Sequence, residues 1–296
     1  MRAWFAVVAL AFASSASVAG PEERAKMHLT SDSYTVTWGA AAAFDPGAES
    51  EIGDGNGHGG TLNWTRFRPV KNGVEVLSIR FDEGWEPYDS KWPPDRAPVT
   101  VKRAVMKPEV YAALLRDFAV VNAARLKPVQ QKSVRHSSND FWVSARVTSN
   151  KKTLVDLDWA GYEVSSEEVN FAKPLAANAL AAEATRGLDF KEHALTDEER
   201  RWAATKFVRD WKAHKDSKPH WWVRNRSIIT IGVVGDATVF PTLREILGGD
   251  PKGQGVYHAI NAITRLTKTD VRDKPVEAMD VEKVRGEVLD LIKDKN

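Results

Sequence analysis

The sequence of 296 residues contains no cysteine, almost no excess of charge and no long apolar run. Without cysteine there can be no disulfide, no thiolate nucleophile, no lipidated cysteine and no cysteine-ligated zinc or iron–sulfur cluster. The 42 basic and 40 acidic side chains leave a net charge of +2, which is too weak a field to gather nucleic acid or an anionic membrane. No run approaches the ~18 apolar residues of a membrane-spanning helix. We therefore expect no membrane span and no nucleic-acid partner.

The first twenty residues have the pattern of a targeting segment. Arg2 supplies a positive start, and Ala3 to Ala13 form an apolar run of eleven residues. Ser17-Val18-Ala19 then fits the small-x-small rule for cleavage. The sequence therefore predicts a signal peptide cleaved after Ala19 and an exported protein, either periplasmic or extracellular.

The chain from Tyr34 to about Glu168 has mostly the period of two that is typical of strands, because alternate side chains of a strand face opposite sides of a sheet. Leu62 to Arg68 alternates, Lys71-Asn72-Gly73 supplies a turn, and Val74 to Phe81 alternates again. Asn-Gly between two such runs favours a tight hairpin. We therefore expect an antiparallel sheet.

Further elements of the same part follow from the same patterns. A helix is predicted after Pro108, since proline suits the first helical turn. Its apolar stripe consists of Tyr111, Leu114, Leu115, Phe118 and Val121. Strands are predicted at Val99–Val105, Phe141–Thr148 and Leu154–Val164, and an alanine-rich helix at about Leu175–Thr185.

Beyond Arg186-Gly187 the pattern becomes helical throughout. Thr196-Asp197-Glu198-Glu199 is a capping box, in which the threonine hydroxyl and the second glutamate satisfy amides of the first turn. Later helices are predicted at about Trp222–Val234, from Pro241 to Gly248, at Val256–Leu266 and after Asp280.

Two of these helices share a spacing of apolar residues. Ile228, Ile231 and Val234 recur 32 residues later as Ile260, Ile263 and Leu266. Arg226–Asp236 followed by Pro241–Leu247 resembles the second helix of one HEAT repeat running into the first helix of the next, and His258–Thr264 looks like the following second helix. The resemblance covers about Thr196–Asn296 and implies a concave face that binds proteins or peptides.

These patterns predict an α+β fold, in which an N-terminal antiparallel sheet with covering helices is followed by an all-α HEAT-like helical-repeat domain. The expected divisions are a signal peptide at 1–19, a flexible N-terminal segment leading into the first strand at 20–60, an α+β domain at 61–187 and a HEAT-like helical domain at 188–296.

The sequence contains none of the familiar catalytic motifs, so no reaction can be assigned and the prediction leans away from an enzyme. The loop 82–95 interleaves carboxylates with aromatic rings, which could contact sugars or proline-containing peptides, or could simply pack back on the sheet. The candidate ligand-binding residues in this loop are Trp85, Glu86, Tyr88, Asp89 and Trp92. An extracytoplasmic hydrolase or carbohydrate-binding protein using this loop is the alternative function, with Glu83 as a further candidate.

A glycine-rich loop at 53–60 offers Asp54, Asn56 and His58 as possible cation ligands, although its spacing matches neither a calcium loop nor a zinc site. We interpret the loop as a flexible hairpin or linker and expect no metal and no cofactor. A fold dependent on a cation at Asp54 and Asn56 stays open as a third possibility.

Two further pairs of polar residues allow either a structural or a chemical interpretation. Asp156 and Asp158 lie two apart on a predicted strand and hence on one face, where outward polar positions are the ordinary interpretation. His214 and His220 flank a proline-containing loop and could meet at a metal, but no third ligand is evident. The favoured function is therefore an exported protein-binding or scaffolding protein with a protein or peptide partner, and a glycan as the other possible ligand.

Overall fold

The computed structural model describes residues 20–56, 61–81, 99–129, 136–164, 168–215, 221–249, 254–269, 271 and 280–295. The predicted signal peptide and the whole acidic and aromatic loop at 82–95 lie outside these residues. Among the described residues, no helix is long and apolar enough to cross a membrane.

The strands form one large sheet and one small one. In chain order they are β1 (Tyr34–Thr37), β2 (Glu49–Asn56), β3 (Thr61–Val70), β4 (Gly73–Phe81), β5 (Val99–Met106), β6 (Arg125–Pro128), β7 (His136–Ser149), β8 (Lys152–Val164) and β9 (Lys191–Glu192). Seven of them make an antiparallel sheet in the order β8-β7-β2-β3-β4-β5-β9, and β1 pairs with β6.

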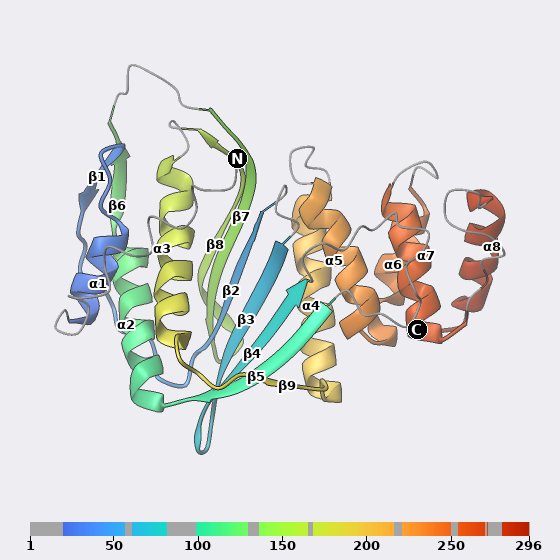
Figure 1. Cartoon of the computed structure of the whole chain (residues 1–296), viewed down its shortest axis with the longest axis horizontal. Coiled ribbons are helices and arrows are strands. Elements are labelled where there is room, and N and C mark those ends of the chain that lie inside the picture. The colour runs from blue at the N-terminus through green and yellow to red at the C-terminus, as the bar shows by residue number, and fades with distance from the viewer. Residues whose placement is uncertain are drawn as a thin grey trace.

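The helices lie on both sides of the large sheet (Figure 1). They are α1 (Pro21–His28), α2 (Pro108–Ala123), α3 (Glu168–Thr185), α4 (Asp197–His214), α5 (Trp221–Val234), α6 (Phe240–Leu247), α7 (Gln254–Thr267) and α8 (Val281–Leu291), with a short 3-10 turn at Ala237–Val239. Helices α1, α2 and α3 lie on one side, and α4 lies on the other, followed outward by α5, α6, α7 and α8 (Figure 1).

The predicted hairpins are confirmed. β3 and β4 pair along their length and are joined at Lys71 and Asn72, and Gly73 has a φ of +153°, where a side chain would be strained. β7 and β8 are joined by a turn in which Asn150 and Lys151 take φ values of +48° and +65°. The Asn-Gly turn predicted from the sequence therefore forms the first hairpin, and the two strands predicted at Phe141–Thr148 and Leu154–Val164 form the second.

Side chains of the sheet alternate between two hydrophobic cores. Val74 and Val76 of β4 point to the face covered by α2 and α3, whereas Leu77 and Ile79 point to the face covered by α4. We call these the α2–α3 face and the α4 face. The α2–α3 face packs against the helix stripe predicted after Pro108, all of whose members are buried: Tyr111, Leu114, Leu115, Phe118 and Val121.

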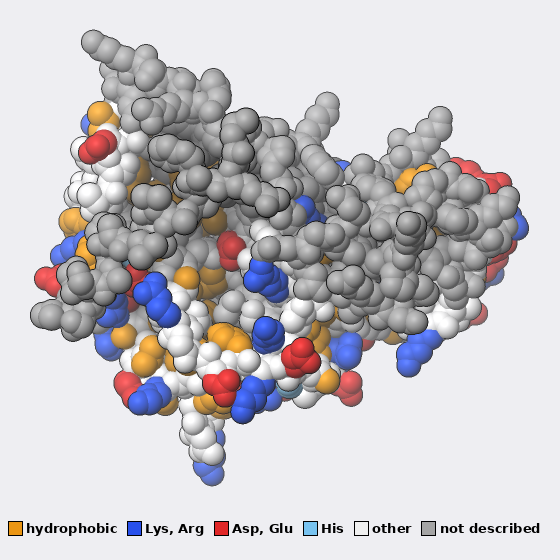
Figure 2. Space-filling model, viewed as in Figure 1, with side chains coloured by type: hydrophobic (Ala, Val, Ile, Leu, Met, Phe, Trp, Pro, Cys, Tyr) orange, Lys and Arg blue, Asp and Glu red, His pale blue; other side chains and the backbone are white. Residues whose placement is uncertain are grey.

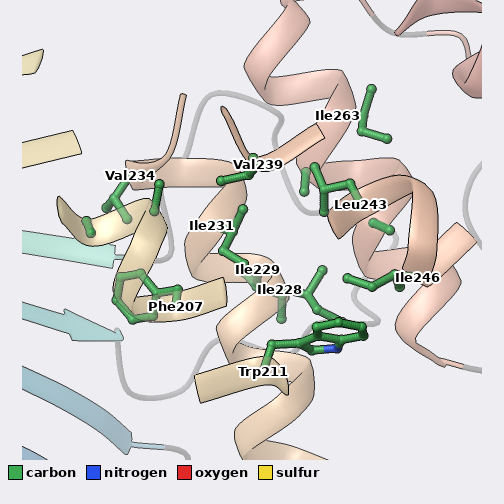
Figure 3. Packing of buried hydrophobic residues seen from close by; sticks show 14 of the residues in the cluster. Phe207, Trp211, Ile228, Ile229, Ile231, Val234, Val239, Leu243, Ile246 and Ile263 are labelled. Carbon is green, nitrogen blue, oxygen red and sulfur yellow. The ribbon is translucent and has the colours of Figure 1, made fainter. Parts of the chain in front are cut away.

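The core of the α4 face continues without interruption into the C-terminal helices. It joins Leu62 and Trp64 of the sheet to Phe207 and Trp211 of α4, and from there to the isoleucines of α5 and α7. Figure 3 shows Phe207 and Trp211 beside Ile228, Ile231 and Val234 of α5, with Leu243, Ile246 and Ile263 beyond them. One hydrophobic core therefore spans the sheet and the helical part of the chain.

The predicted architecture, a sheet domain followed by a separate all-α HEAT-like repeat domain, is wrong. The apolar face of α4 packs on the sheet as well as on α5, and β9, which falls inside the predicted helical domain, pairs with β5. The physical reason is that both faces of the sheet carry apolar residues and both need a cover. The chain is an α+β protein whose C-terminal helices supply the second cover. The family resemblance itself is not tested by these contacts and stays a prediction.

Residues 20–60 were predicted as a flexible segment leading into the first strand, and the structure assigns a helix and two strands to residues 20–56 of this segment. It contains α1, β1 and β2, and β2 is an interior strand between β7 and β3. The glycines of this segment suggested flexibility, but Gly53 is required by packing. A Cβ at this position would lie 2.3 Å from Cη2 of Trp142 and 2.6 Å from Oγ of Ser144. Glycine is needed here because neighbouring side chains cross closely over the strand.

Candidate binding site

The charged residues of the α4 face are aligned across the sheet by the pairing of its strands. Asp156 of β8 lies opposite Arg146 of β7, Arg146 lies opposite Glu51 of β2, and Glu51 lies opposite Arg66 of β3. We call these four residues the charged row. Its signs alternate from the edge of the sheet inward, so that each side chain has an opposite charge beside it, and directly opposite charges stabilise paired strands.

Glu51 joins the charged row to α4. Its Oε1 accepts a hydrogen bond of 2.7 Å from Nε1 of Trp202, and its Oε2 accepts one of 2.7 Å from Nη2 of Arg209. Burial raises the pKa of Glu51, but the charges of Lys206 and Arg209 together with these hydrogen bonds outweigh burial and lower the pKa to about 2. Glu51 is therefore a permanent anion beneath the helix.

Lys206 of α4 is held at the centre of the site with only 2% of its side chain exposed. Its Nζ donates a hydrogen bond of 2.8 Å to Oδ2 of Asp210 and lies 6.0 Å and 5.8 Å from the ring centroids of Trp64 and Trp142. Nε1 of Trp64 donates to the same carboxylate oxygen at 3.3 Å. The buried charge of Lys206 is thus compensated by a carboxylate and two aromatic faces.

Asp158 of β8 is the second fixed carboxylate. Its Oδ1 accepts a hydrogen bond of 2.7 Å from Nε1 of Trp142, and its Oδ2 lies 3.1 Å from Nε2 of His214. Burial raises the pKa of Asp158, but His214, Trp142 and the charge of Lys206 outweigh it, so the pKa lies below its usual value. Asp158 therefore stays ionised and fixes the end of α4 against the edge of the sheet.

A cleft of about 310 Å³ opens between β7, β8 and α4 at these residues. Four acids and three bases line it: Glu51, Asp156, Asp158 and Asp210, with Arg146, Lys206 and Arg209. Lys206 and Asp210 form a buried floor together with the partly buried Glu51, whereas Asp156, with 61% of its side chain exposed, and Arg209, with 37%, form an accessible lip. The cleft therefore presents charges of both signs to solvent, above a floor whose charged side chains are held by their own ion pairs and hydrogen bonds.

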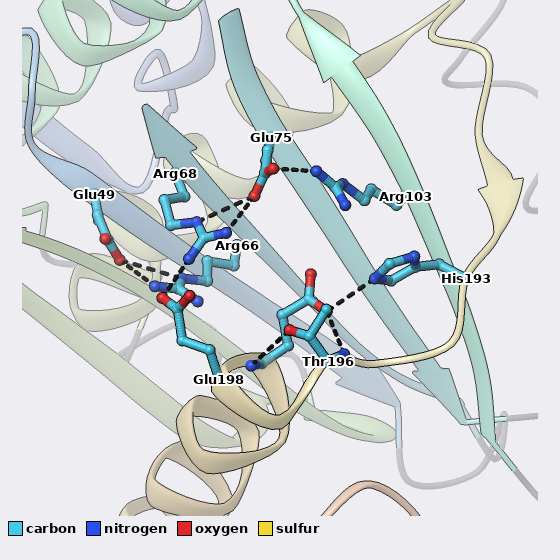
Figure 4. A network of polar contacts seen from close by, with 9 residues as sticks. Glu49, Arg66, Arg68, Glu75, Arg103, His193, Thr196 and Glu198 are labelled. Atoms are coloured by element: carbon cyan, nitrogen blue, oxygen red, sulfur yellow. Dashed lines mark hydrogen bonds and ion pairs between the residues drawn. The ribbon is translucent and has the colours of Figure 1, made fainter. Parts of the chain in front are cut away.

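A second polar network lies on the same face, on the part of the sheet that leads to the first turn of α4 (Figure 4). Glu75 pairs with both Arg68 and Arg103, and Arg68 also pairs with Glu198 of α4. The predicted capping box is confirmed here, since Oγ1 of Thr196 accepts from the amide of Glu199 and the Glu199 carboxylate accepts from the amide of Thr196 at 2.7 Å. These interactions hold the first turn of α4 against the sheet.

The visible described surface carries no large patch of one sign. Figure 2 shows Lys and Arg side chains interspersed with Asp and Glu. This agrees with the net charge of +2 and gives no support to a polyanion as ligand.

The residues that the sequence singled out fall in different places. The ligand-binding candidates Trp85, Glu86, Tyr88, Asp89 and Trp92, like Glu83, lie outside the described residues, as do His58 and His220. Asp54 and Asn56 belong to β2, where Asp54 accepts a hydrogen bond from Asn63. Burial raises the pKa of Asp54, with Asn63 and Arg80 acting in the opposite direction. The described residues contain no group of three or more acids, histidines or cysteines placed to hold a metal ion.

Asp156 and Asp158 do share a face of β8, as predicted. That face forms one wall of the cleft and is not simply a solvent-exposed surface. Glu51, Lys206, Arg209 and Asp210 also line the cleft but were not among the residues predicted from the sequence. A signal was present for two of them, because Lys206 and Asp210 are spaced i, i+4 and each immediately precedes an apolar residue of the buried stripe of α4. Glu51 was hidden by its place beside the glycine-rich segment.

Comparisons with known proteins find no match for the chain, neither among protein-family models, nor among curated proteins, nor among solved structures.

Proposed function

We propose that this chain is an exported, non-enzymatic binding protein, and that the cleft between β7, β8 and α4 receives a segment of a protein or peptide partner. The observation that carries the proposal is the combination of a largely buried floor of paired charged side chains with an accessible lip of both signs. Export is supported by the pattern of the first nineteen residues.

The fixed geometry of the floor favours binding. Glu51 has both carboxylate oxygens engaged, and the ammonium group of Lys206 is held by Asp210. A partner that contacts these groups does not have to order them first, so little conformational entropy is lost when it binds. Fixed charges also select partners, since a like charge brought against them is repelled.

The mixture of signs favours a polypeptide over a nucleic acid. The four carboxylates of the cleft would repel a phosphate backbone, whose binding needs a surplus of basic side chains. A polypeptide can offer basic and acidic side chains at successive positions and can therefore match both signs. The alternative use of the loop 82–95 by a hydrolase or carbohydrate-binding protein stays a prediction.

Selection from a library of random displayed peptides against the full chain tests the proposal. We expect a consensus to emerge and expect a synthetic consensus peptide to bind the double variant Arg146→Ala, Asp156→Ala about tenfold more weakly. The control is Asp189→Ala, because Asp189 is 82% exposed and does not line the cleft. Fluorescence anisotropy gives the affinities.

The absence of any consensus would overturn the proposal. So would a consensus peptide that binds the double variant and the wild-type chain equally well, because binding would then occur elsewhere.

A further inference from the structure

We infer that the partner binds as an added β-strand along the outer edge of β8, and that it carries two basic residues on either side of an apolar one. This inference rests on the proposed function and specifies the chemistry of the partner. It follows from three independent features of β8: its place in the sheet, the charge pattern on one face and the apolar residues on the other.

The longest edge strand of the sheet is β8. It has 13 residues and ends the sheet at one side, where no described strand pairs with its outer edge. At the other side β9 has two residues and pairs with Lys102 and Arg103, so that edge consists of β9 and the rest of the eight-residue β5. An edge strand presents unpaired amide and carbonyl groups along its outer side, and an extended peptide can pair with them. β8 offers the longer template for such pairing, and it also borders the cleft.

The charged row specifies what should lie opposite Asp156. From the interior outward the row is Arg66, Glu51, Arg146 and Asp156, with alternating sign at each strand. Asp156 ends the row, is 61% exposed, and has its Oδ2 3.7 Å from Nη1 of Arg146. One more strand would continue the alternation with Lys or Arg opposite Asp156.

Asp158, the next residue of β8 on the same face, also favours a basic residue opposite it, but less strongly than Asp156 does. Asp158 lies two residues along β8 and has 38% of its side chain exposed, although Trp142 and His214 already hold its oxygens. A second basic residue, two positions from the first on the added strand, would lie beside Asp158. The spacing of two follows from the alternation of side chains along a strand.

The opposite face of β8 is apolar. Val155 is buried, Leu157 packs against the same core, and the ring of Trp159 lies 4.9 Å from that of Phe171 on α3. The residue between the two basic positions of an added strand would point to this face, where an aliphatic side chain can extend the core. The pattern basic, apolar, basic therefore matches both faces of β8.

The same charges argue against a second copy of this chain as the occupant. An antiparallel pairing of two β8 strands centred on Leu157 would bring Asp156 of each copy opposite Asp158 of the other. Directly opposed like charges destabilise paired strands. Acidic side chains on an edge strand thus disfavour self-association while admitting a basic partner.

Charge exchange between short synthetic peptides and the full chain tests the inference. One peptide has Lys-Val-Lys at its centre, and a second has Glu-Val-Glu in the same flanking sequence. We expect the wild-type chain to bind the first at least about tenfold more tightly, and Asp156→Lys to lose that preference or reverse it. Asp189→Lys, an exposed site that does not line the cleft, makes the same charge change and is expected to leave the preference intact.

Backbone pairing needs its own readout. N-methylation of the amides that face β8 is expected to weaken the Lys-Val-Lys peptide about tenfold or more, whereas methylation of the alternate amides is expected to have little effect. An ordinary ion pair at the surface would show no such alternation.

The outcomes separate the two proposals. Peptides that bind the cleft without a charge preference, or without sensitivity to methylation in either register, overturn the added strand and leave the proposed function standing. If neither synthetic peptide binds but the displayed library yields a consensus peptide, the added strand is overturned and the proposed function stands; if the library yields no consensus either, both proposals fail. A chain that sediments as a dimer and loses binding when it dimerises would identify a second copy as the occupant and overturn the inference.

Discussion

The two faces of the large sheet are built from the same strands but differ in how they are covered. On the α2–α3 face, valines and an isoleucine of the sheet meet an apolar helix stripe across the whole contact. On the α4 face, part of the sheet contacts α4 and α5 through apolar side chains. Another part contacts α4 through charged side chains, which line the cleft. The comparison shows that one period-two pattern can give a purely structural face and, behind it, a face with charges available for binding.

The largest expected effect tests whether the α4 face belongs to one core with the C-terminal helices. Phe207 is fully buried and its ring lies 4.2 Å from that of Trp64. We expect Phe207→Ala to lower the free energy of unfolding by about 4 kcal/mol and to do so in a single transition. Circular dichroism and tryptophan fluorescence measured through urea unfolding check this. Two separate transitions, one for the helices and one for the sheet, would contradict a shared core.

The next effect concerns the buried charge of Lys206. Lys206→Met removes the ammonium group and leaves the buried carboxylate of Asp210 with Nε1 of Trp64 as a hydrogen-bond donor and Nε of Arg209 at 3.5 Å, so we expect a loss of about 3 kcal/mol. Adding Asp210→Asn removes the negative charge that has lost its Lys206 partner and should restore part of the stability. Chemical unfolding of both variants measures this coupling. A double variant no more stable than Lys206→Met would show that the pair is not coupled.

The two faces are expected to respond to pH in opposite directions. On the α4 face the pKa of Glu51 is lowered from 4.5 to about 2, so Glu51 stabilises the fold above its unfolded pKa. That contribution, about 3 kcal/mol, is lost as pH falls from about 4.5 through 2. Glu51→Gln should remove this part of the acid dependence. The measurement is the free energy of unfolding of variant and wild type as a function of pH. A difference between the two that does not change between about pH 4.5 and 2 would contradict the predicted role of Glu51.

On the α2–α3 face the buried acid is Asp117 of α2. Burial raises its pKa to about 6, although Arg24 at 3.1 Å acts in the opposite direction, and Oδ1 of Asp117 has no hydrogen-bond partner among the described residues. A raised pKa means that the protonated form is favoured by folding, so its stabilisation is present below about pH 4 and lost as pH rises through 6.

We therefore expect the wild-type chain to lose about 3 kcal/mol over that interval relative to Asp117→Asn, which does not titrate. The same pH series measures it. A loss of stability over the same interval that persists in Asp117→Asn would contradict the assignment to Asp117.

The smallest expected effect lies at the lip of the cleft. Asp156 is 61% exposed and 3.7 Å from Arg146, so we expect Asp156→Asn to change stability by less than about 0.5 kcal/mol. A thermal melt checks this. A loss above about 1 kcal/mol would mean that Asp156 holds the sheet together and is not available to a partner.

The sequence predicted those elements whose signals are local. The hairpin turn ending at Gly73, the helix after Pro108 and the capping box at Thr196 were all found because a turn, a proline and a cap act within a few residues. The common core was not predictable in this way, because the apolar stripe of α4 is the same whether it packs on a sheet or on another helix.

The cleft was harder still to predict. Its residues come from β2, β7, β8 and α4, which are up to about 160 positions apart, and strand register alone brings Arg146 beside Glu51. A sequence pattern gives the face of each residue but not its neighbours across the sheet. A charged side chain within an apolar helix stripe, as at Lys206, was the one local sign of a buried polar site.

Amide hydrogen exchange of the full chain, with and without the Lys-Val-Lys peptide, tests the central contrast between the two faces most directly. The account predicts new protection along residues 152–164 of β8 and at the end of α4 near His214, with no change in α2. Protection confined to α2 and α3, or an unchanged pattern when the peptide is demonstrably bound, would contradict the assignment of binding to the α4 face.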